Sequence, residues 1–406
     1  MNDIVLPDIV DIRNQIFYDI WKLVDDKYIL FSDKSIDWNE IRLLYEKSLN
    51  QIETYESLFE YIDQMLLELR DPHTRIIYSP HISDLGIMPL ALNCINGDYY
   101  INKSLIDSKL STGSRLLSID GIPIKEVELG IFNKYRFQSL SANITAFLRE
   151  FSIGNLGHCL KIKATANLGN EIEDSIYFQS IDSNIFEGTN VERMTENISL
   201  CQIREFEYTV GYIKIINFRN KKVVKDFIDA ITYLNTKKTL IIDIRGNDGG
   251  FIKVASDLVA FLTKHEIDLG YKVQRKQGGK YDEYEEPANI IIRPTDSSVL
   301  YEKIVILCDE FTMSSAEFIF LSALKNAEDK ITVVGKKTGG LPYGASVFTL
   351  FDGTKVQITT SKYLDLEGNV IAKDGIIPHF EIHNSEQLLT EDKDHQLEFA
   401  LKLCQG

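Results

Sequence analysis

Strand-like and helix-like patterns alternate along the second half of the chain, and this alternation constrains the fold more than any other feature. The patterns predict strands at residues 212–216, 239–244, 304–308 and 331–334, and helices at residues 223–234 and 254–262. Parallel strands need a long crossover connection, which is usually a helix. We therefore expect an α/β core over residues 186–406, layered around a mostly parallel sheet and closed by a hairpin at residues 346–360 and a final helix at residues 391–403.

The first part of the chain carries three amphipathic helical patterns. They cover residues 12–28, 41–49 and 58–69, and we expect a helical domain over residues 1–80 built as a small bundle. Pro72 ends the third pattern, because a proline disfavours the helical conformation in the residue before it. His73 is therefore expected on a rigid turn.

Residues 81–185 change character, with short strand patterns between clusters of Gly, Asn and Ser. This pattern predicts a small β-rich domain. Residues 118–124 resemble a hairpin of PDZ domains, and Leu85, Gly86 and Ile87 resemble the loop with which PDZ domains bind a peptide C-terminus. The resemblance implies a PDZ-like domain in which these three residues contact a peptide.

Composition limits the partners of the chain. The formal net charge of −16 argues against nucleic acid and anionic membrane surfaces, since both demand a cationic face. The five cysteines are an odd number and widely spaced, as in reduced cytosolic proteins. No apolar span of membrane length, zinc-type spacing or phosphate-binding loop occurs. We expect a cytoplasmic protein without a cofactor or a metal, and the sequence does not indicate an oligomeric state.

Ser314 lies between the buried strand pattern at residues 304–307 and the start of a helical pattern. The first N–H groups of a helix lack intrahelical partners and carry the positive end of the helix dipole, so an oxyanion can be held there. The alternative is that Ser314 or Thr312 caps this helix and Glu317 completes a capping box.

An ordered set of motifs spreads over nearly the whole chain. It comprises residues 71–74, 212–218, 241–250, 314–317, 335–340, 360–363 and 375–378. In this order the motifs resemble the C-terminal-processing (tail-specific) serine peptidases and the tricorn core proteases. The resemblance implies a crotonase-like or Clp-protease-like α/β core (α+β overall) with an N-terminal helical segment and usually a PDZ domain. It also implies cleavage of peptides near their C-termini.

The resemblance offers two versions of the catalytic machinery, a serine with a lysine or a serine with an N-terminal histidine. The lysine position falls within residues 339–342, which contain no lysine. The motif register therefore implies the histidine-bearing version, with Ser314 as nucleophile and His73 as general base. A free serine hydroxyl is a poor nucleophile at neutral pH and needs such a base.

The remaining site residues are also implied by the resemblance. The tricorn-like pattern carries a glutamate where this chain has Ala372, and Asp374 is the candidate to orient His73, with Asp71 as an alternative. The N–H groups of Gly249, Gly250 and Ser315 are the candidates for the oxyanion hole; such a donor contributes about 3 kcal/mol to transition-state binding.

Three functions remain open from the sequence. The first is a serine endopeptidase that acts on peptide or protein tails. The second is a catalytically impaired family member that binds a peptide or an apolar ligand, because the lysine is missing and the acid is displaced. The third is a processing enzyme with one small peptide precursor as its substrate.

Overall fold

A six-stranded sheet forms the centre of the C-terminal part of the chain. The computed structural model describes residues 9–82, 85–166, 169–180, 200–206, 209–296, 301–327, 330–385, 387–391 and 393–405. The strand order is β10 (Cys201–Phe206), β11 (Val210–Ile215), β12 (Thr239–Asp243), β15 (Lys303–Cys308), β16 (Ile331–Gly335) and β19 (Phe380–Glu381). Only the β10–β11 pair is antiparallel. The predicted mostly parallel sheet is confirmed.

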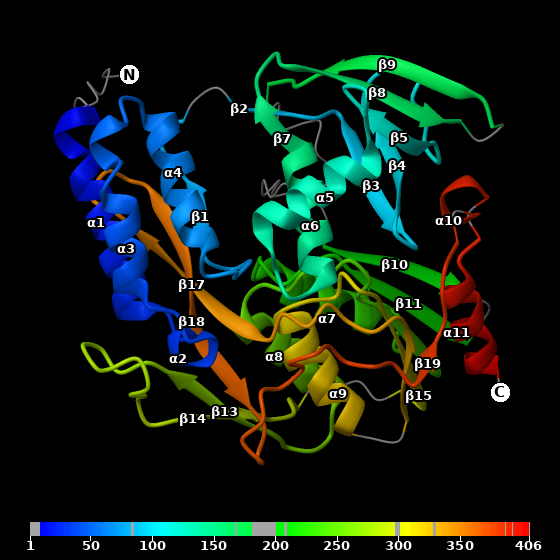
Figure 1. Cartoon of the computed structure of the whole chain (residues 1–406). Coiled ribbons are helices and arrows are strands. Elements are labelled where there is room, and N and C mark those ends of the chain that lie inside the picture. Colours follow the sequence, from blue (N-terminus) through cyan, green and yellow to red (C-terminus); the bar gives the residue numbers. More distant parts are fainter. Residues whose placement is uncertain are drawn as a thin grey trace, which may run out of the picture.

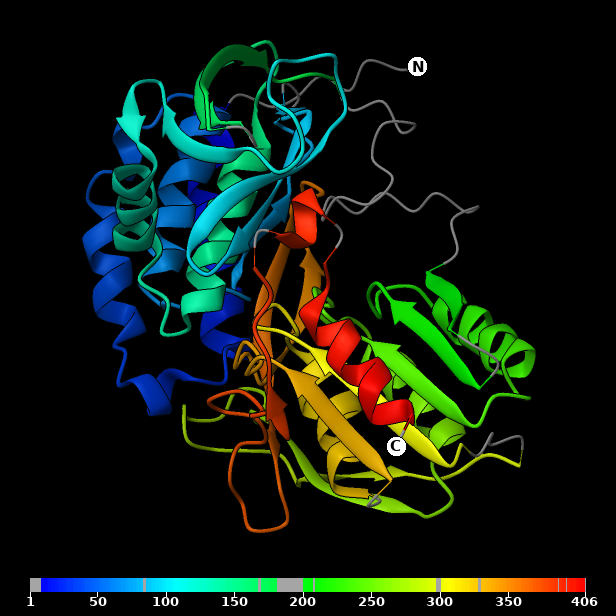
Figure 2. The same ribbon diagram turned by 90° about the vertical axis from the view of Figure 1, so that its right-hand side faces the viewer.

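Helices cover both faces of this sheet (Figures 1 and 2). One face carries α7 (Lys222–Tyr233), α8 (Ile252–Leu262), the π-helix η2 (Ala316–Leu321) and α9 (Ser322–Ala327); the other carries α11 (His395–Gln405). Neighbouring residues of β15 point to opposite faces: Ile304 packs with the first group, whereas Val305 packs with α11. Burial on both faces explains the continuous apolar strands.

A second, antiparallel sheet joins the two ends of the chain. Its order is β1 (Arg75–Tyr78), β18 (Lys355–Leu364), β13 (Ile267–Gln274) and β14 (Ala288–Ile292), and β17 (Tyr343–Thr349) also pairs with β18. The β17–β18 pair is the predicted hairpin, whereas β13 and β14 were not predicted. Because Arg75 lies opposite Gln357 of β18, the turn that carries His73 is fixed to the C-terminal half.

The N-terminal helices pack on this second sheet. They are α1 (Ile9–Lys27), α2 (Phe31–Lys34), α3 (Trp38–Glu46) and α4 (Tyr55–Leu67), with the short 3-10 helix η1 (Leu49–Gln51) between the last two. Asp37 caps α3, and Thr54 and Ser57 form a capping box on α4. The helical core includes Val356 and Ile358 of β18. The expected bundle of helices therefore packs on the sheet, which covers apolar faces of the helices.

Residues 85–180 form a unit with its own hydrophobic core. Its strands are β2 (Leu85–Ile87), β3 (Leu90–Ile95), β4 (Asp98–Ser104), β5 (Arg115–Ile119), β6 (Ile122–Pro123), β7 (Ile153–Asn155), β8 (Cys159–Thr165) and β9 (Glu171–Tyr177). The predicted hairpin at residues 118–124 is confirmed by β5 and β6. Two helices that the sequence did not predict, α5 (Ile124–Tyr135) and α6 (Leu140–Ser152), pack below these strands (Figure 1).

The C-terminal segment ends in α10 (Gln387–Thr390) and α11; α11 is the predicted final helix and begins four residues later than expected. Within the described ranges, no helix is long and apolar enough to cross a membrane.

Candidate active site

Ser314 lies in a tight turn between β15 and the helix that follows it. Its backbone has φ 54°, in the left-handed region that L-residues with a side chain rarely adopt. Such a conformation costs about 1 to 3 kcal/mol and is concentrated at functional sites. The residue is partly exposed, and its hydroxyl makes no hydrogen bond with a described residue. The hydroxyl is therefore available for chemistry.

A buried carboxylate holds the backbone at this turn. Glu317 Oε1 accepts from the N–H groups of Ser314 at 3.2 Å and Leu341 at 2.5 Å. Its Oε2 accepts from Thr338 Oγ1 at 2.7 Å and from the N–H of Gly340 at 3.0 Å. Burial raises the pKa of Glu317 to about 7, although these hydrogen bonds act against the rise. The capping box considered as an alternative is therefore only half formed. Glu317 accepts the backbone N–H of Ser314, but the Ser314 hydroxyl does not cap the helix.

Gly249 and Gly250 both contact the turn that carries Ser314 and Ser315. A methyl carbon on Gly249 would lie 2.8 Å from Cβ of Ser314 and 2.9 Å from the nitrogen of Ser315, and Gly249 has φ 92°. Only glycine fits this position. Its N–H donates to Asn247 Oδ1 at 3.0 Å, whereas the N–H groups of Gly250 and Ser315 have no acceptor among the described residues. Of the three predicted donors, the structure leaves Gly250 and Ser315 free.

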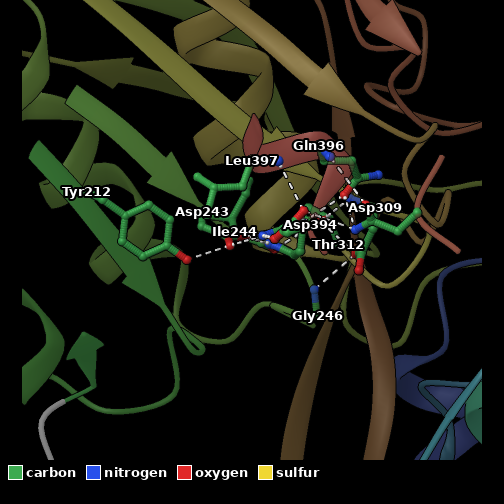
Figure 3. A network of polar contacts seen from close by, with 11 residues as sticks. Tyr212, Asp243, Ile244, Gly246, Asp309, Thr312, Asp394, Gln396 and Leu397 are labelled. Atoms are coloured by element: carbon green, nitrogen blue, oxygen red, sulfur yellow. Dashed lines mark hydrogen bonds and ion pairs between the residues drawn. The ribbon is translucent and has the colours of Figure 1, made fainter. Parts of the chain in front are cut away.

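An ion-pair network anchors the loop that carries these glycines (Figure 3). Arg245 Nε donates to Asp243 Oδ1 at 2.9 Å, and its terminal nitrogens bind Asp394, next to α11. Tyr212 donates its hydroxyl to Asp243 at 2.7 Å. Burial alone would raise the pKa of Asp243, but the charge of Arg245 lowers it to about 2. Asp309 accepts the N–H of Gly246 at 3.0 Å, so both ends of the turn are held.

His73 occupies the predicted turn after α4. Its N–H donates to Asp71 Oδ1 at 3.1 Å, and its carbonyl accepts from Gln357 Nε2 at 2.9 Å. The ring makes no hydrogen bond with a described residue, and Nδ1 is buried without a partner. Burial lowers the pKa of His73, which favours the neutral imidazole that a general base requires.

A continuous set of contacts connects the surroundings of His73 with Ser314. The charges of Arg219 and Asp248 both act on His73. These two residues form an ion pair, and a methyl carbon on Gly250 would lie 2.5 Å from the backbone nitrogen of Arg219. Asp248 in turn precedes the glycine that contacts Ser314. His73 therefore lies within electrostatic reach of the loop that contacts Ser314, and a contact between the two side chains stays a prediction.

The two candidate acids have different surroundings. Asp71 Oδ2 accepts from Thr74 Oγ1 at 2.7 Å and from Thr359 Oγ1 at 2.6 Å, so this carboxylate joins the turn to β18. Asp374 lies beside Gly340, and its charge acts on Tyr343. Neither carboxylate hydrogen-bonds the imidazole in the described part of the chain. The assignment of the acid stays a prediction.

The predicted peptide-binding residues lie in a paired strand. Leu85, Gly86 and Ile87 form β2, which pairs with β7. The N–H of Ile87 donates to Gln179 O at 2.8 Å, and its carbonyl accepts from the N–H of Gln179 at 2.9 Å. The Ile87 N–H is therefore occupied, and a role of this segment in peptide binding stays a prediction.

Sequence reasoning gave Glu317 only a capping role and did not find its partners at residues 338–341. The sequence did contain a signal for these contacts. A glutamate three residues after a candidate nucleophile faces the segment that packs on the first turn of that helix. The arginines around His73 were also missed; Arg75 follows His73 by two residues.

Comparison with known proteins identifies the class. Residues 209–382 match peptidase family S41, and residues 11–67 match the Tricorn protease C1 domain. A carboxyl-terminal-processing protease of Synechocystis sp. is 24% identical over 416 residues, covering 95% of this chain and 85% of that protein. The carboxy-terminal processing protease CtpA of Bacillus subtilis is 29% identical over 194 residues, covering 47% of this chain and 38% of CtpA.

Solved structures agree on the fold. Mature CPAF superposes with a TM-score of 0.77 at 15% identity, covering 98% of this chain and 97% of that chain. The photosystem II D1 C-terminal processing protease gives 0.55 at 18% identity, covering 91% and 93%. The tricorn protease gives 0.52 at 18% identity, covering 98% of this chain and 37% of that chain.

The fold and these matches define a serine peptidase of the C-terminal-processing and tricorn class. The chain carries an S41 peptidase domain and a tricorn-type C1 segment. These two matches fall on the α/β core and on the N-terminal helices of the structure.

Proposed function

We propose that this peptidase cleaves peptide or protein substrates near their C-termini, with Ser314 as nucleophile and His73 as general base. The observation that carries the proposal is the Ser314 hydroxyl, which is unbonded and lies in a left-handed turn next to two unbonded N–H groups. Ser314 Oγ attacks the scissile carbonyl while His73 takes its proton. The N–H groups of Gly250 and Ser315 stabilise the oxyanion, His73 returns the proton to the leaving amine, and water then hydrolyses the acyl-enzyme.

The orienting acid is part of this proposal. Asp374 is assigned to it by resemblance, and the assignment requires a change in geometry, because His73 Nδ1 has no partner in the present conformation. Catalytic hydrogen bonds of free enzymes often tighten only when substrate is bound. An imidazole without a carboxylate is poorly fixed in its tautomer, so an enzyme in this conformation is expected to be slow.

The proposal extends to the rest of the chain. We infer a helical domain at residues 1–80, a PDZ-like domain at residues 81–185 and a peptidase core at residues 186–406. In this arrangement Leu85, Gly86 and Ile87 contact the substrate tail, which requires β2 to accept an added strand. A cytoplasmic location and the absence of nucleic-acid and membrane partners remain part of the proposal, supported by the widely spaced free cysteines and the acidic charge.

A second candidate function is a binding module for a peptide or an apolar ligand. The specific observation in its favour is the imidazole of His73, which lacks an orienting carboxylate. A chain of this kind would hold its ligand at the Ser314 turn without acylation.

A covalent probe separates the two functions. The protein is incubated with a fluorophosphonate, and the modified residue is identified by peptide mass spectrometry. Lactacystin serves as a second probe, since mature CPAF has been solved in complex with it. We expect modification at Ser314, none in Ser314→Ala, and full modification in Ser322→Ala, which alters the same helix. A folded wild-type protein that reacts with neither probe favours the binding module.

A further inference from the structure

Arg75 is a partly buried arginine without a partner among the described residues. It lies at the start of β1, two residues after His73. Its Nε is buried and unbonded, and the guanidinium forms no hydrogen bond or ion pair with any residue that the structure describes. Arginines that lose part of their hydration in a protein are normally paired, because the lost hydration is otherwise not compensated. An exception next to a proposed catalytic base therefore needs an explanation.

Two further arginines from other parts of the fold lie close enough for their charges to act on Arg75. Burial, followed by the charges of Arg149 and Arg219, lowers the pKa of Arg75 to about 10. Arg149 belongs to α6; its guanidinium lies 5.3 Å from the ring of Tyr135 and has no hydrogen bond or ion pair among the described residues. Arg219 follows β11 and is paired with Asp248. Arg75, Arg149 and Arg219 are called the arginine cluster below.

The carboxylates near the arginine cluster form no ion pair with Arg75 or Arg149 among the described residues. Asp248 is paired with Arg219, and Asp63 of α4 is near enough to act on Arg75 but forms no ion pair with it. Burial raises the pKa of Asp63 to about 6, so burial disfavours its charged form. Glu150 is near enough for Arg149 to act on it, but its ion pair is with Lys134.

The arginine cluster borders the proposed catalytic residues. The backbone nitrogen of Arg219 abuts Gly250, and Arg75 begins β1 two residues after His73. The helix of Arg149 is held to the segment of Gly339 at its N-terminus, where Ser139 donates its hydroxyl to Gly339 O at 2.6 Å; Arg149 lies ten residues further along the chain.

We propose that the arginine cluster is an anionic subsite that binds a carboxylate of the substrate next to the scissile bond. This inference rests on the proposed peptidase function and specifies its substrate class. The guanidinium group presents paired donors that match a carboxylate, and a bound carboxylate relieves the repulsion among the three arginines. The carboxylate belongs to the substrate C-terminus or to an Asp or Glu side chain.

Binding to an inactive variant tests the proposal independently of catalysis. Immobilised Ser314→Ala protein is incubated with a library of ten-residue peptides, prepared with free or amidated C-termini and with Glu or Gln at each position. We expect preferential retention of carboxylate forms, and a tenfold to hundredfold loss of that preference in Arg75→Gln and Arg149→Gln, as for charge-assisted hydrogen bonds. Arg293→Gln, an exposed arginine paired with Glu266, is the control.

Each outcome has a meaning. Loss of retention on amidation assigns the subsite to the C-terminal carboxylate, and loss on Glu to Gln exchange assigns it to a side chain. Equal retention of all forms, including no retention of any form, overturns the proposal. Thermal unfolding of Arg75→Gln shows that the variant is folded. Fluorophosphonate labelling of the same arginine variants reports on Ser314 separately, so a failed catalytic assignment is distinguished from a failed subsite.

Discussion

Glu317 accepts the backbone N–H of Ser314 at 3.2 Å, and through the same carboxylate it holds the segment at residues 338–341 against the nucleophile turn. All four groups that contact the Glu317 carboxylate are hydrogen-bond donors, so the side chain at this position must offer acceptors only. This relationship explains how a serine is kept in a left-handed conformation, because the turn and the segment packed on it share one buried anchor.

The first prediction concerns this anchor. In Glu317→Gln an amide NH2 replaces one of the oxygens and faces N–H or O–H donors, leaving buried groups unbonded. We expect the free energy of unfolding in urea to fall by about 2 to 4 kcal/mol. Glu310→Gln is the matched control. Among the described residues Glu310 pairs only with Lys336, at 2.8 Å, and it is partly exposed, so this substitution is expected to change stability by less than about 1 kcal/mol. Equal stability of Glu317→Gln and the wild type would contradict the anchoring role.

The second prediction concerns pH. A general base must be neutral, and burial lowers the pKa of His73 below its usual value. The rate of fluorophosphonate labelling should therefore rise as the pH increases through that lowered pKa. We expect the half-maximal rate below pH of about 6.5, with a plateau at neutral pH. His73→Gln should abolish this titration. A midpoint well above neutrality would show that another group is the base.

The third prediction concerns the close contact at Gly249. A methyl group in Gly249→Ala would meet Cβ of Ser314 at 2.8 Å and displace the nucleophile from Gly250. We expect labelling to slow by at least about tenfold, the effect of roughly 1.4 kcal/mol in the barrier. Gly246→Ala separates strain from contact, because Gly246 also has a positive φ (74°) but no atom within 4 Å of the added carbon. Equal rates in both variants would assign the effect to backbone strain alone.

The fourth prediction concerns the attachment of α11. Asp394 binds Arg245 and accepts the N–H of Leu397 at 3.0 Å, so it combines an ion pair with a helix cap. Asp394→Asn retains a capping side chain and loses the charge, whereas Asp394→Ala loses both. We expect faster amide exchange in residues 395–405 for both variants, with a loss of stability of about 1 kcal/mol for Asn and about 2 kcal/mol for Ala. Unchanged exchange in Asp394→Ala would show that α11 is held by its apolar contacts alone.

Much of the fold could be predicted because its signals are local. The parallel strands are apolar throughout since both faces are covered, and the caps at Asp37 and Thr54 mark helix starts by themselves. Strand β13 was missed because Gly270 and the polar residues Asp268 and Lys272 interrupt its apolar pattern. The contact of the N-terminal helices with β18 was not predicted, because nothing in the helices alone shows what covers their apolar faces.

Only those residues of the candidate site that lie in recognisable motifs could be predicted from the sequence. Ser314, His73 and the two glycines each lie in a short recognisable segment. The structure places Gly249 against Ser314, whereas the approach of His73 to Ser314 stays a prediction. The partners of Glu317 and the arginine cluster come from segments far apart in the sequence, so no spacing reveals them. Whether His73 Nδ1 finds a hydrogen-bond partner depends on small shifts of side chains in space, which no pattern of residues encodes.

The central claim is that the imidazole of His73 activates the Ser314 hydroxyl, and the rate of fluorophosphonate labelling at neutral pH tests it most directly. We predict that His73→Ala labels Ser314 slower than the wild type by a factor of about 10² to 10⁴, the usual contribution of a general base. Gln357→Ala, which loses only a hydrogen bond to the His73 carbonyl, should stay within about tenfold of the wild type. Labelling of a folded His73→Ala protein at the wild-type rate would contradict the claim.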